Sequence, residues 1–399
     1  MLTLEQASAQ MLAAVQPIAG VEELPTAAAG GRVLARPVMA LVDVPPVDNA
    51  QMDGYAVRCA DVPRVPAVLP VALRIAAGQA PGILPPAAAA RIFTGAPIPE
   101  GCDAVVMQEA AEARSEGVEI REAPVPGRWI RRRGSDLARG SVALAAGQAL
   151  RAQHLGIAAS VGAAHLTVVR RPRVALFCTG DELATPGEPA APGRIYNSNR
   201  YVLAGLLQAL GCEVHDLGIV PDSLAATQRA LERAATGADL VLSSGGVSVG
   251  EEDHVKAALA SMGALQLWQI AIKPGKPLAF GRVGAVPFIG LPGNPVASFV
   301  TFVILVRPFL LRCMGVSEVA PRAARLRADF ERAADPVRRE FLRARLNEQG
   351  GLDLYPSQNS ALLSSVSWAD GLVELPPGTA VVRGQAVRYL SLGELSGPP

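Results

Sequence analysis

The sequence has few aromatic residues, few histidines and no paired cysteines. Aromatic residues make up 4% of the 399 positions, so the chain is poorly supplied for stacking against bases or sugars. With four histidines far apart, oxygen ligands for a hard cation are a better expectation than a His/Cys site for a transition metal. No CxxC pair occurs among the five cysteines, which is typical of reduced core thiols in a cytosolic protein: Cys59, Cys102, Cys178, Cys212 and Cys313.

Excess charge and long hydrophobic runs are also missing. The formal net charge is +1, which provides no basic footprint for nucleic acid. The longest apolar run, Phe299 to Val306, is interrupted by Arg307-Pro308 and is far shorter than the ~20 residues that a membrane span needs. The N-terminus carries Glu5 and no basic segment, unlike a signal peptide. We expect a soluble, cytoplasmic protein with no nucleic-acid or membrane partner.

The chain is long enough for several domains, since half of its residues are hydrophobic. Helix-compatible apolar spacing over residues 1–24 and over Gly147 to Thr167 predicts a helical N-terminal domain made of residues 1–40 and 141–172. Recurrent prolines among short β-branched runs predict a β-rich domain over 41–140, and a further β-rich domain is expected over 319–399.

Between these parts, residues 173–318 alternate strand and helix patterns, which predicts a parallel α/β sheet. The predicted strands are Val174–Phe177, Glu213–Gly218, Ala238–Leu242, Leu267–Ile272 and Pro287–Ile289. The predicted helices are Asn199–Leu210, which ends at a Gly211 C-cap, Asp222–Ala235, Asp253–Met262 and Pro295–Arg312.

Polar residues follow each predicted strand, and ligands of such sheets bind at the carboxyl ends of the strands. These loops contain the carboxylates Glu182, Asp222 and Asp253, the glycines Gly245 and Gly246, and the lysines Lys273 and Lys276. Glycines expose backbone N–H groups to anions, lysines neutralise phosphate, and carboxylate oxygens hold a divalent metal. Their convergence therefore predicts a site for a phosphorylated ligand with a hard metal ion.

Each residue also has a purely structural interpretation. Asp222 and Asp253 are good helix N-caps, Gly245-Gly246 could make a tight turn, and Glu182 and the lysines could be solvated loop charges. Two further clusters, Pro45 to Ala56 and Arg91 to Pro99, could be turn chemistry alone. The run Arg131-Arg132-Arg133 could bind an anion or form a solvated basic face.

Taken together, these motifs resemble the MoeA family, the molybdopterin molybdenumtransferases that include the E domain of gephyrin. The matching segments occur in family order over nearly the whole chain: MDGYA at 52–56, FTGAPIP at 93–99, TGDEL at 179–183, SSGGVSVGEED at 243–253, IKPGKP at 272–277 and LPGNP at 291–295. The resemblance implies an elongated homodimer whose subunit has a MogA-like, three-layer parallel α/β domain, a β-rich insertion domain and a C-terminal β-barrel-like domain.

The same resemblance implies a reaction: molybdenum is inserted from molybdate into adenylylated molybdopterin, and AMP is released with Mg²⁺. It implies metal ligation by Asp222 and Asp253, and a partner subunit that supplies Asp53 and Thr94. A MogA-type adenylyltransferase is a possible further partner. By motif position the functional residues are Asp53, Thr94, Glu182, Asp222, Asp253 and Lys273, with Arg343 and Ser360 from looser matches; the cofactor-binding residues are Gly245, Gly246, Ser248, Lys276, Pro292 and Pro295.

One departure concerns Trp268-Gln269, where bacterial relatives often carry a basic residue after the tryptophan. A neutral amide cannot supply that charge, and Arg343 and Lys276 are the candidates to compensate for it. The residues leave open whether water or molybdate accepts the AMP group, and whether molybdate or tungstate is preferred. Alternative functions are molybdopterin adenylylation, a CinA-type pyrophosphatase activity and a gephyrin-like scaffold without catalysis.

Overall fold

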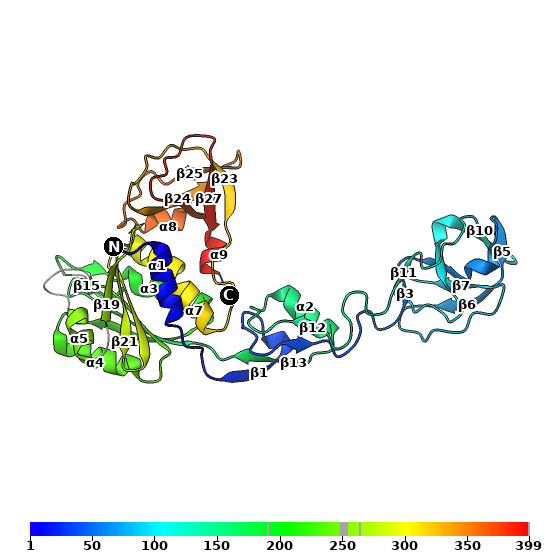
Figure 1. Cartoon of the computed structure of the whole chain (residues 1–399), viewed down its shortest axis with the longest axis horizontal. Coiled ribbons are helices and arrows are strands. Elements are labelled where there is room, and N and C mark those ends of the chain that lie inside the picture. The colour runs from blue at the N-terminus through cyan, green and yellow to red at the C-terminus, as the bar shows by residue number, and fades with distance from the viewer. Residues whose placement is uncertain (190, 248–253, 263–264, 398–399) are drawn as a thin grey trace.

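The structure is a computed structural model that describes residues 1–189, 191–247, 254–262 and 265–397. Figure 1 shows an elongated molecule with a large α/β domain and a β-barrel at one end. A small β-rich domain lies at the opposite end, and a domain built around strands β1 and β13 lies between them. Two residues of the predicted site, Ser248 and Asp253, lie outside the described residues.

The α/β domain is built on a six-stranded mixed sheet. Its strands in spatial order are β17 (Glu213–Val220), β14 (Arg173–Thr179), β18 (Leu240–Ser244), β22 (Val286–Leu291), β21 (Pro277–Val283) and β19 (Leu265–Gln269). The first four are mutually parallel, as predicted, whereas β21 runs antiparallel to both of its neighbours. The sequence analysis missed β21, which is joined to β22 by a tight turn at Gly284-Ala285.

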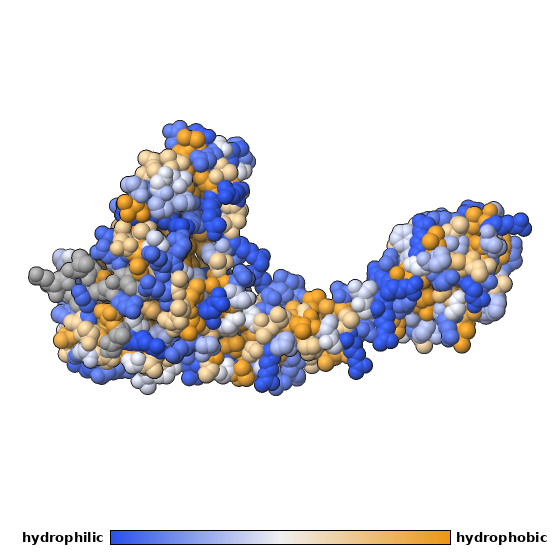
Figure 2. Space-filling view, viewed as in Figure 1, coloured by the Kyte–Doolittle hydropathy of each residue, from blue (hydrophilic) through white to orange (hydrophobic). Residues whose placement is uncertain are grey.

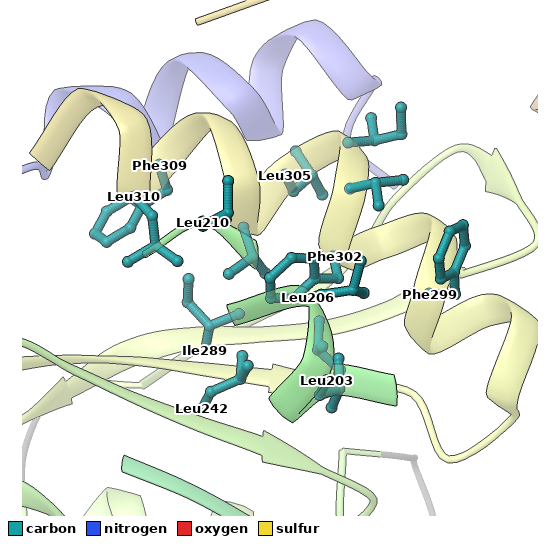
Figure 3. Close-up of a cluster of buried hydrophobic side chains, with 14 of the residues drawn as sticks. Leu203, Leu206, Leu210, Leu242, Ile289, Phe299, Phe302, Leu305, Phe309 and Leu310 are labelled. Carbon is teal, nitrogen blue, oxygen red and sulfur yellow. The ribbon is translucent and has the colours of Figure 1, made fainter. Parts of the chain in front are cut away.

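Helices cover both faces of this sheet and complete the three layers. One face carries α3 (Ser198–Ala209), the segment from α6 to α7, and the N-terminal helix α1 (Leu4–Ala13); the other carries α4 (Leu224–Ala235) and α5 (His254–Met262). In Figure 3, leucines of α3 pack between the sheet residues Leu242 and Ile289 on one side and the phenylalanines of the long helix from α6 to α7 on the other.

That long helix consists of α6 (Pro295–Thr301), a π-helical segment η4 (Phe302–Val306) and α7 (Arg307–Cys313). Residues Pro295–Cys313 are long and apolar enough to cross a membrane, but 94% of the relevant window is buried inside the protein. The helix therefore serves as the core helix of the α/β domain, where its apolar composition is explained by burial on all sides.

The helix boundaries remove one structural interpretation of Asp222. Helix α4 begins at Leu224, and its N-cap is Ser223, whose side chain accepts a hydrogen bond from the Ala226 N–H. Asp222 is therefore not the N-cap of this helix. The predicted end of α3 is confirmed, because Gly211 follows its last turn with a φ of 79°.

The N-terminal region is more β-structured than predicted. Strand β1 (Val21–Pro25) pairs with β13 (His165–Val169), and β2 (Val38–Met39) pairs with β12 (Val142–Leu144). Helix is confined here to α1 and α2 (Ala152–Ser160) plus the short η1 (Thr26–Ala28). The predicted helices over 1–24 and 147–167 were too long, because β-branched residues at 21 and 167–169 pair across the chain.

The expected β-rich insertion domain is present, and its strands lie between Asn49 and Arg131. A four-stranded sheet contains β6 (Val71–Ile75), β7 (Ala89–Ile92), β4 (Gly54–Val57) and β8 (Ala104–Met107). A three-stranded sheet contains β5 (Ala67–Leu69), β10 (Gly117–Ile120) and β9 (Ala111–Arg114), and a small ladder joins β3 (Asn49–Ala50) to β11 (Ile130–Arg131). Two 3₁₀ turns, η2 (Cys59–Asp61) and η3 (Gln108–Ala110), connect these strands.

A hydrophilic surface covers the junction between this domain and the middle of the molecule, near β3 and β11 (Figures 1 and 2). The arginine run of residues 131–133 lies there. Arg132 pairs with Asp48 at 2.6 Å and Arg133 pairs with Asp43 at 2.5 Å. Two of the three arginines thus neutralise local carboxylates, which favours the structural interpretation of the run.

The C-terminal domain is a closed five-stranded barrel, as the expected barrel-like fold requires. Its strands are β24 (Arg339–Leu346), β25 (Gly351–Leu354), β23 (Ala324–Ala328), β27 (Ala386–Ser391) and β26 (Gly371–Leu375), with β26 returning to β24. The short helices α8 (Ser364–Trp368) and α9 (Leu392–Ser396) accompany them. A short strand from the α/β domain, β20 (Ile272–Lys273), adds to β24 and ties the two domains together.

Candidate functional site

A large cleft lies where the carboxyl ends of the central strands meet the barrel. Its volume is about 1110 Å³, and loops from both domains line it. The structure brings together most of the predicted site residues in this one cleft: Glu182, Asp222, Gly245, Gly246, Lys273, Lys276, Pro292, Pro295 and Ser360. The expected convergence of acids, lysines and glycines at one edge is therefore present in the fold.

The glycine loop after β18 lines the cleft. Gly245 and Gly246 have φ angles of 90° and 67°, a region that L side chains rarely adopt. A Cβ on Gly246 would lie 2.5 Å from the Val255 Cγ2 and 2.9 Å from the Thr179 Oγ1. Only glycine fits this turn, because any side chain would clash with Val255 and Thr179.

Thr179 provides a polar group at the same place. Its hydroxyl is buried and makes no hydrogen bond to the described residues. A buried hydroxyl without a partner is costly, so an oxygen-rich ligand on the glycine loop would satisfy it. The combination of bare backbone and an unused hydroxyl suits a phosphate group.

The acidic side of the cleft contains Asp222 and Glu182. Burial raises the pKa of Asp222, and the negative charges of Asp181 and Glu182 raise it further. A hydrogen bond from the Asp181 N–H, at 3.2 Å, lowers the pKa but does not outweigh these effects. A cation beside these carboxylates would relieve their repulsion, and their oxygens suit a hard ion such as Mg²⁺.

No group of three His, Cys, Asp or Glu side chains in the described part of the chain forms a metal-binding cluster. Mg²⁺ does not require such a cluster, since it commonly keeps several waters and uses one or two carboxylates plus substrate phosphates. The oxygens of Asp222 and Glu182 therefore fit Mg²⁺ only together with ligand oxygens.

The basic side is set by the strand pairing between β20 and β24. Lys273 lies opposite Glu340 in the ladder, and its Nζ is 3.0 Å from the Glu340 Oε1. The same carboxylate accepts two hydrogen bonds from Arg332, at 3.0 and 2.6 Å. Lys276 instead lies exposed on the cleft wall. The two lysines thus differ, because Lys273 already has a carboxylate partner.

Arg338 is a cleft residue that the sequence analysis missed. It immediately precedes β24 and lines the cleft beside the lysine loop. Asp335 holds its guanidinium at 2.9 Å and accepts a hydrogen bond from its backbone N–H. Backbone and side-chain hydrogen bonds lower the pKa of Asp335 to about 2, so this carboxylate stays charged and fixes Arg338 in place. The adjacent basic pair before a strand was the only signal in the sequence.

Arg343 lies behind the cleft wall. Its side chain is fully buried, and it donates hydrogen bonds to the Ser365 hydroxyl at 3.1 Å and the Asn359 carbonyl at 3.2 Å. Burial, together with the charge of Arg332, lowers the pKa of Arg343 to about 10. In this arrangement Arg343 supports the 358–360 loop, which lines the cleft, and does not itself line it. It therefore does not compensate for Gln269, which is exposed and also lies outside the cleft lining.

Asp53 and Thr94 form a separate unit in the β-rich domain. The Thr94 N–H and hydroxyl both donate to the Asp53 Oδ1, at 2.8 and 2.7 Å, and these bonds lower the pKa of Asp53. Thr94 follows β7, which lies at the opposite end of the molecule from β15 (Leu183–Ala184) (Figure 1). Leu183 lines the cleft, so Thr94 lies far from it. Within one chain these two residues do not meet the other predicted site residues.

Three sequence profiles match almost the entire chain. The MoeA N-terminal region (domain I and II) matches residues 2–162, a probable molybdopterin binding domain matches 175–312, and the MoeA C-terminal region (domain IV) matches 324–392.

Named relatives and a solved structure agree with these matches. The molybdopterin molybdenumtransferase of Haemophilus influenzae is 42% identical over 316 residues, which cover 79% of this chain and 78% of the relative. The molybdopterin molybdenumtransferase 2 of Mycobacterium tuberculosis is 39% identical over 382 residues, covering 92% and 93%. The crystal structure of the molybdopterin biosynthesis MoeA protein from Pyrococcus horikoshii OT3 superposes with a TM-score of 0.84 at 27% identity, covering 98% of this chain and 100% of that one.

Proposed function

This chain belongs to the MoeA family of molybdopterin molybdenumtransferases, and from that membership we propose how its cleft works. The protein is an enzyme of molybdenum-cofactor biosynthesis that inserts molybdenum into molybdopterin. In our proposal the substrates are adenylylated molybdopterin and molybdate, and AMP is released. The observation that carries the proposal is the convergence of acids, lysines and a glycine loop in one cleft.

The glycine loop would hold a phosphate of the substrate. The Gly245 N–H is already used, since it donates to the Leu291 carbonyl at 3.1 Å. The Gly246 N–H can approach a phosphate oxygen closely, and the Thr179 hydroxyl, which has no hydrogen-bond partner among the described residues, can bind another. Lys276 brings an exposed positive charge to the same cleft, and Arg338 adds a guanidinium that is paired with Asp335. Charge of this kind stabilises the negative charge that develops when a phosphoanhydride breaks.

Asp222, with Glu182 beside it, would hold Mg²⁺ in the proposal, and Asp253 remains the proposed second metal ligand. Mg²⁺ would supply charge neutralisation at the phosphoryl oxygens when bound. The raised pKa of Asp222 supports this assignment, since a bound cation would offset the burial and the negative charges of Asp181 and Glu182 that raise it. Ser360 of the barrel and Lys273, whose strand β20 pairs with the barrel strand β24, could bind molybdate.

We expect no covalent enzyme intermediate. The described residues that line the cleft include no histidine, so no Ser–His or Cys–His pair is available there to generate a nucleophile. Positioning and electrostatics remain as the means of catalysis. The acceptor of the adenylyl group would be a small oxygen nucleophile, either water or molybdate.

The proposed active unit is a homodimer. Asp53 and Thr94 lie at the other end of the subunit from the cleft, which supports their delivery into the cleft of a partner copy (Figure 1). We also propose that the protein works in the cytoplasm and receives its substrate from a MogA-type adenylyltransferase. A role as the adenylyltransferase itself is not favoured, since the relatives bear the molybdenumtransferase name over most of this chain.

The test of the chemistry is AMP release from purified protein given adenylylated molybdopterin, Mg²⁺ and molybdate, scored beside reconstitution of an apo-molybdoenzyme. Asp222→Ala should abolish both readouts, whereas its neighbour Ser223→Ala should cost stability and leave them intact. Binding of the pterin without either product, at any molybdate concentration, would refute insertion and favour a scaffold. ATP turnover without molybdate would point to adenylylation instead.

The test of the dimer is complementation between two inactive variants. Asp53→Ala and Asp222→Ala subunits are co-expressed so that mixed dimers form. If each cleft combines residues of both subunits, every mixed dimer has one intact site, and about a quarter of wild-type activity should return. If both residues act within one subunit, no mixed dimer has an intact site, and the activity should stay at the level of the single variants.

A further inference from the structure

Tyr196 stands out among the cleft residues by its chemistry. It is the one aromatic side chain among the described residues that line the cleft, in a chain that has only five tyrosines. Half of it, 50%, is exposed to solvent. A half-exposed aromatic ring in the lining of a cleft offers a flat apolar surface to a ligand.

The backbone around Tyr196 holds it next to the acidic side of the site. Residues Ile195–Tyr196 form strand β16, which pairs in parallel with β15 (Leu183–Ala184). The Ile195 N–H donates to the Glu182 carbonyl at 2.7 Å, so the tyrosine segment is bonded directly to a predicted catalytic residue. On its other side Asn197 caps α3, where its side chain accepts the Arg200 N–H.

The ring itself is anchored at its far end. The Tyr196 hydroxyl donates to the Glu188 carbonyl at 3.0 Å, which satisfies the polar tip and leaves the ring face free. An aromatic ring that is fixed in this way loses little conformational entropy when a planar ligand stacks on it. The neighbouring Ile195, 60% exposed and also in the lining, adds apolar surface.

We propose that Tyr196 is the stacking platform for a planar heterocycle of the substrate and so sets specificity for the ring. The inference rests on the proposed function, whose substrate carries two such rings, an adenine and a pterin. Both have the π face that the tyrosine recognises, and the phosphate groups bind elsewhere, on the glycine loop. Tyr196 is a binding residue in this account and takes no part in proton transfer.

The experiment measures equilibrium binding to the full-length protein by calorimetry, with AMP, 6-hydroxymethylpterin and ribose 5-phosphate as probes. Removing a stacked aromatic typically weakens binding of one base about tenfold. Tyr196→Ala should therefore weaken either AMP or the pterin roughly tenfold, and the probe affected identifies the stacked ring. Ribose 5-phosphate has no ring and should bind as it does to wild type.

Three variants control for loss of structure. Tyr196→Phe keeps the ring and should stay near wild-type affinity, while Tyr196→Leu keeps apolar bulk without a π face and should resemble Tyr196→Ala. Tyr201→Ala removes an equally exposed tyrosine, 52% accessible, that is outside the cleft lining, and should change nothing. Thermal unfolding of each variant verifies that it is folded.

The outcomes separate this inference from the proposed function. Wild-type affinities for both ring probes in Tyr196→Ala would overturn the stacking role, while AMP release by the wild type would leave the proposed function standing. If Tyr196→Ala bound ribose 5-phosphate as much more weakly as it bound a ring probe, the stacking role would also be overturned, since the whole site would then have been disturbed. A wild-type protein that binds neither ring probe would refute the inference together with the proposed function.

Discussion

The contact between Lys273 and Glu340 leads to a counterintuitive expectation: removing a buried carboxylate should strengthen anion binding. Glu340 is 3% exposed and lies 3.0 Å from the Nζ of Lys273, which is 38% exposed. The carboxylate competes with any anion for the charge of this lysine. Glu340→Gln keeps the shape of the side chain and removes only the charge, so Lys273 becomes available to a ligand.

The size of the expected gain in molybdate affinity follows from the distance between the bound anion and Glu340. An anion in contact with Lys273 would lie about 6 Å from the Glu340 oxygen, the sum of the observed contact and a hydrogen bond of about 3 Å. One unit charge at that distance is worth about 0.7 kcal/mol at the dielectric constant of water and about 2.8 kcal/mol at an effective value near 20. Because Lys273 is partly exposed, the lower part of this energy range applies. Molybdate should therefore bind to Glu340→Gln roughly three- to tenfold more tightly than to wild type.

Stability should change in the opposite direction. Arg332 loses the acceptor of its two hydrogen bonds, and breaking a buried ion pair from one side costs several kcal/mol when both groups are enclosed. Arg332 is 27% exposed and can regain water, so we expect a loss of about 2 kcal/mol. We therefore expect Glu340→Gln to bind molybdate more tightly than wild type and to have a lower free energy of unfolding.

The effect on stability also has a defined pH dependence. Burial acts to raise the pKa of Glu340, but the hydrogen bonds from Arg332 and Lys273 outweigh it, so the pKa lies below its ordinary value of 4.5. A depressed folded pKa means that the stabilisation is complete above 4.5 and is lost as the pH falls through the folded value. The difference in free energy of unfolding between wild type and Glu340→Gln should therefore be constant near neutral pH and should decrease as the pH falls below 4.5.

The assay is a molybdate titration by calorimetry, paired with urea unfolding. The matched control is the same substitution in a Lys273→Ala background, where the gain in affinity should disappear. Unchanged or weaker molybdate binding by a folded Glu340→Gln variant would refute the reasoning. A gain that persists without Lys273 would show that the charge acts on another group.

Three further outcomes are expected. Gly246→Ala places a Cβ 2.5 Å from the Val255 side chain at a φ of 67°, so AMP affinity should fall more than about tenfold, as measured by calorimetry. Ser223→Ala removes the α4 N-cap and should lower the free energy of unfolding by about 1 kcal/mol in urea, with AMP release unchanged. Arg343→Met replaces a buried guanidinium with an apolar side chain, so stability should stay within about 2 kcal/mol of wild type. Its molybdate affinity should fall because the Asn359 carbonyl loses its donor, and wild-type affinity would contradict that supporting role.

The core of the site was predictable because it depends on local pattern and on one topological rule. Each predicted loop follows a strand of a sheet whose central strands are parallel, and the carboxyl ends of such strands meet at one edge. Glu182, Asp222 and Gly246 could therefore be placed together without any knowledge of tertiary contacts. Local pattern alone predicted α3 and its glycine stop, because apolar helix spacing and a following glycine agree there.

What could not be predicted depends on pairings between distant segments. Nothing near Lys273 in the sequence indicates that Glu340 will lie opposite it, because that contact is made by the pairing of β20 with β24. Arg343 matched a motif, but its burial follows from barrel closure and strand alternation. The helical prediction near Val21 failed for a similar reason, since its strand partner Val169 is far along the chain.

These long-range pairings make the cleft a property of the whole chain and not of the α/β domain alone. The segment before Lys273 is held on one side by the N-terminus, where the Leu2 N–H donates to the Gln269 carbonyl and the Leu2 carbonyl accepts the Ala271 N–H, both at 2.8 Å. On the other side the Arg339 N–H donates to the Ala271 carbonyl, also at 2.8 Å.

The Arg339 side chain adds a second link across the same junction. Its guanidinium reaches both Glu374 in the barrel and Glu5 in helix α1. Lys273 is therefore positioned by three separate regions of the chain, while Arg338 and Ser360 enter the cleft from the barrel side. An α/β domain of this kind without its N-terminal helix and barrel would keep the glycine loop, Asp222 and Lys273, but it would lose Ser360 and the contacts that position Lys273. The barrel thus contributes chemistry to the cleft in addition to stability, which explains why charged contacts are concentrated at its junction with β20.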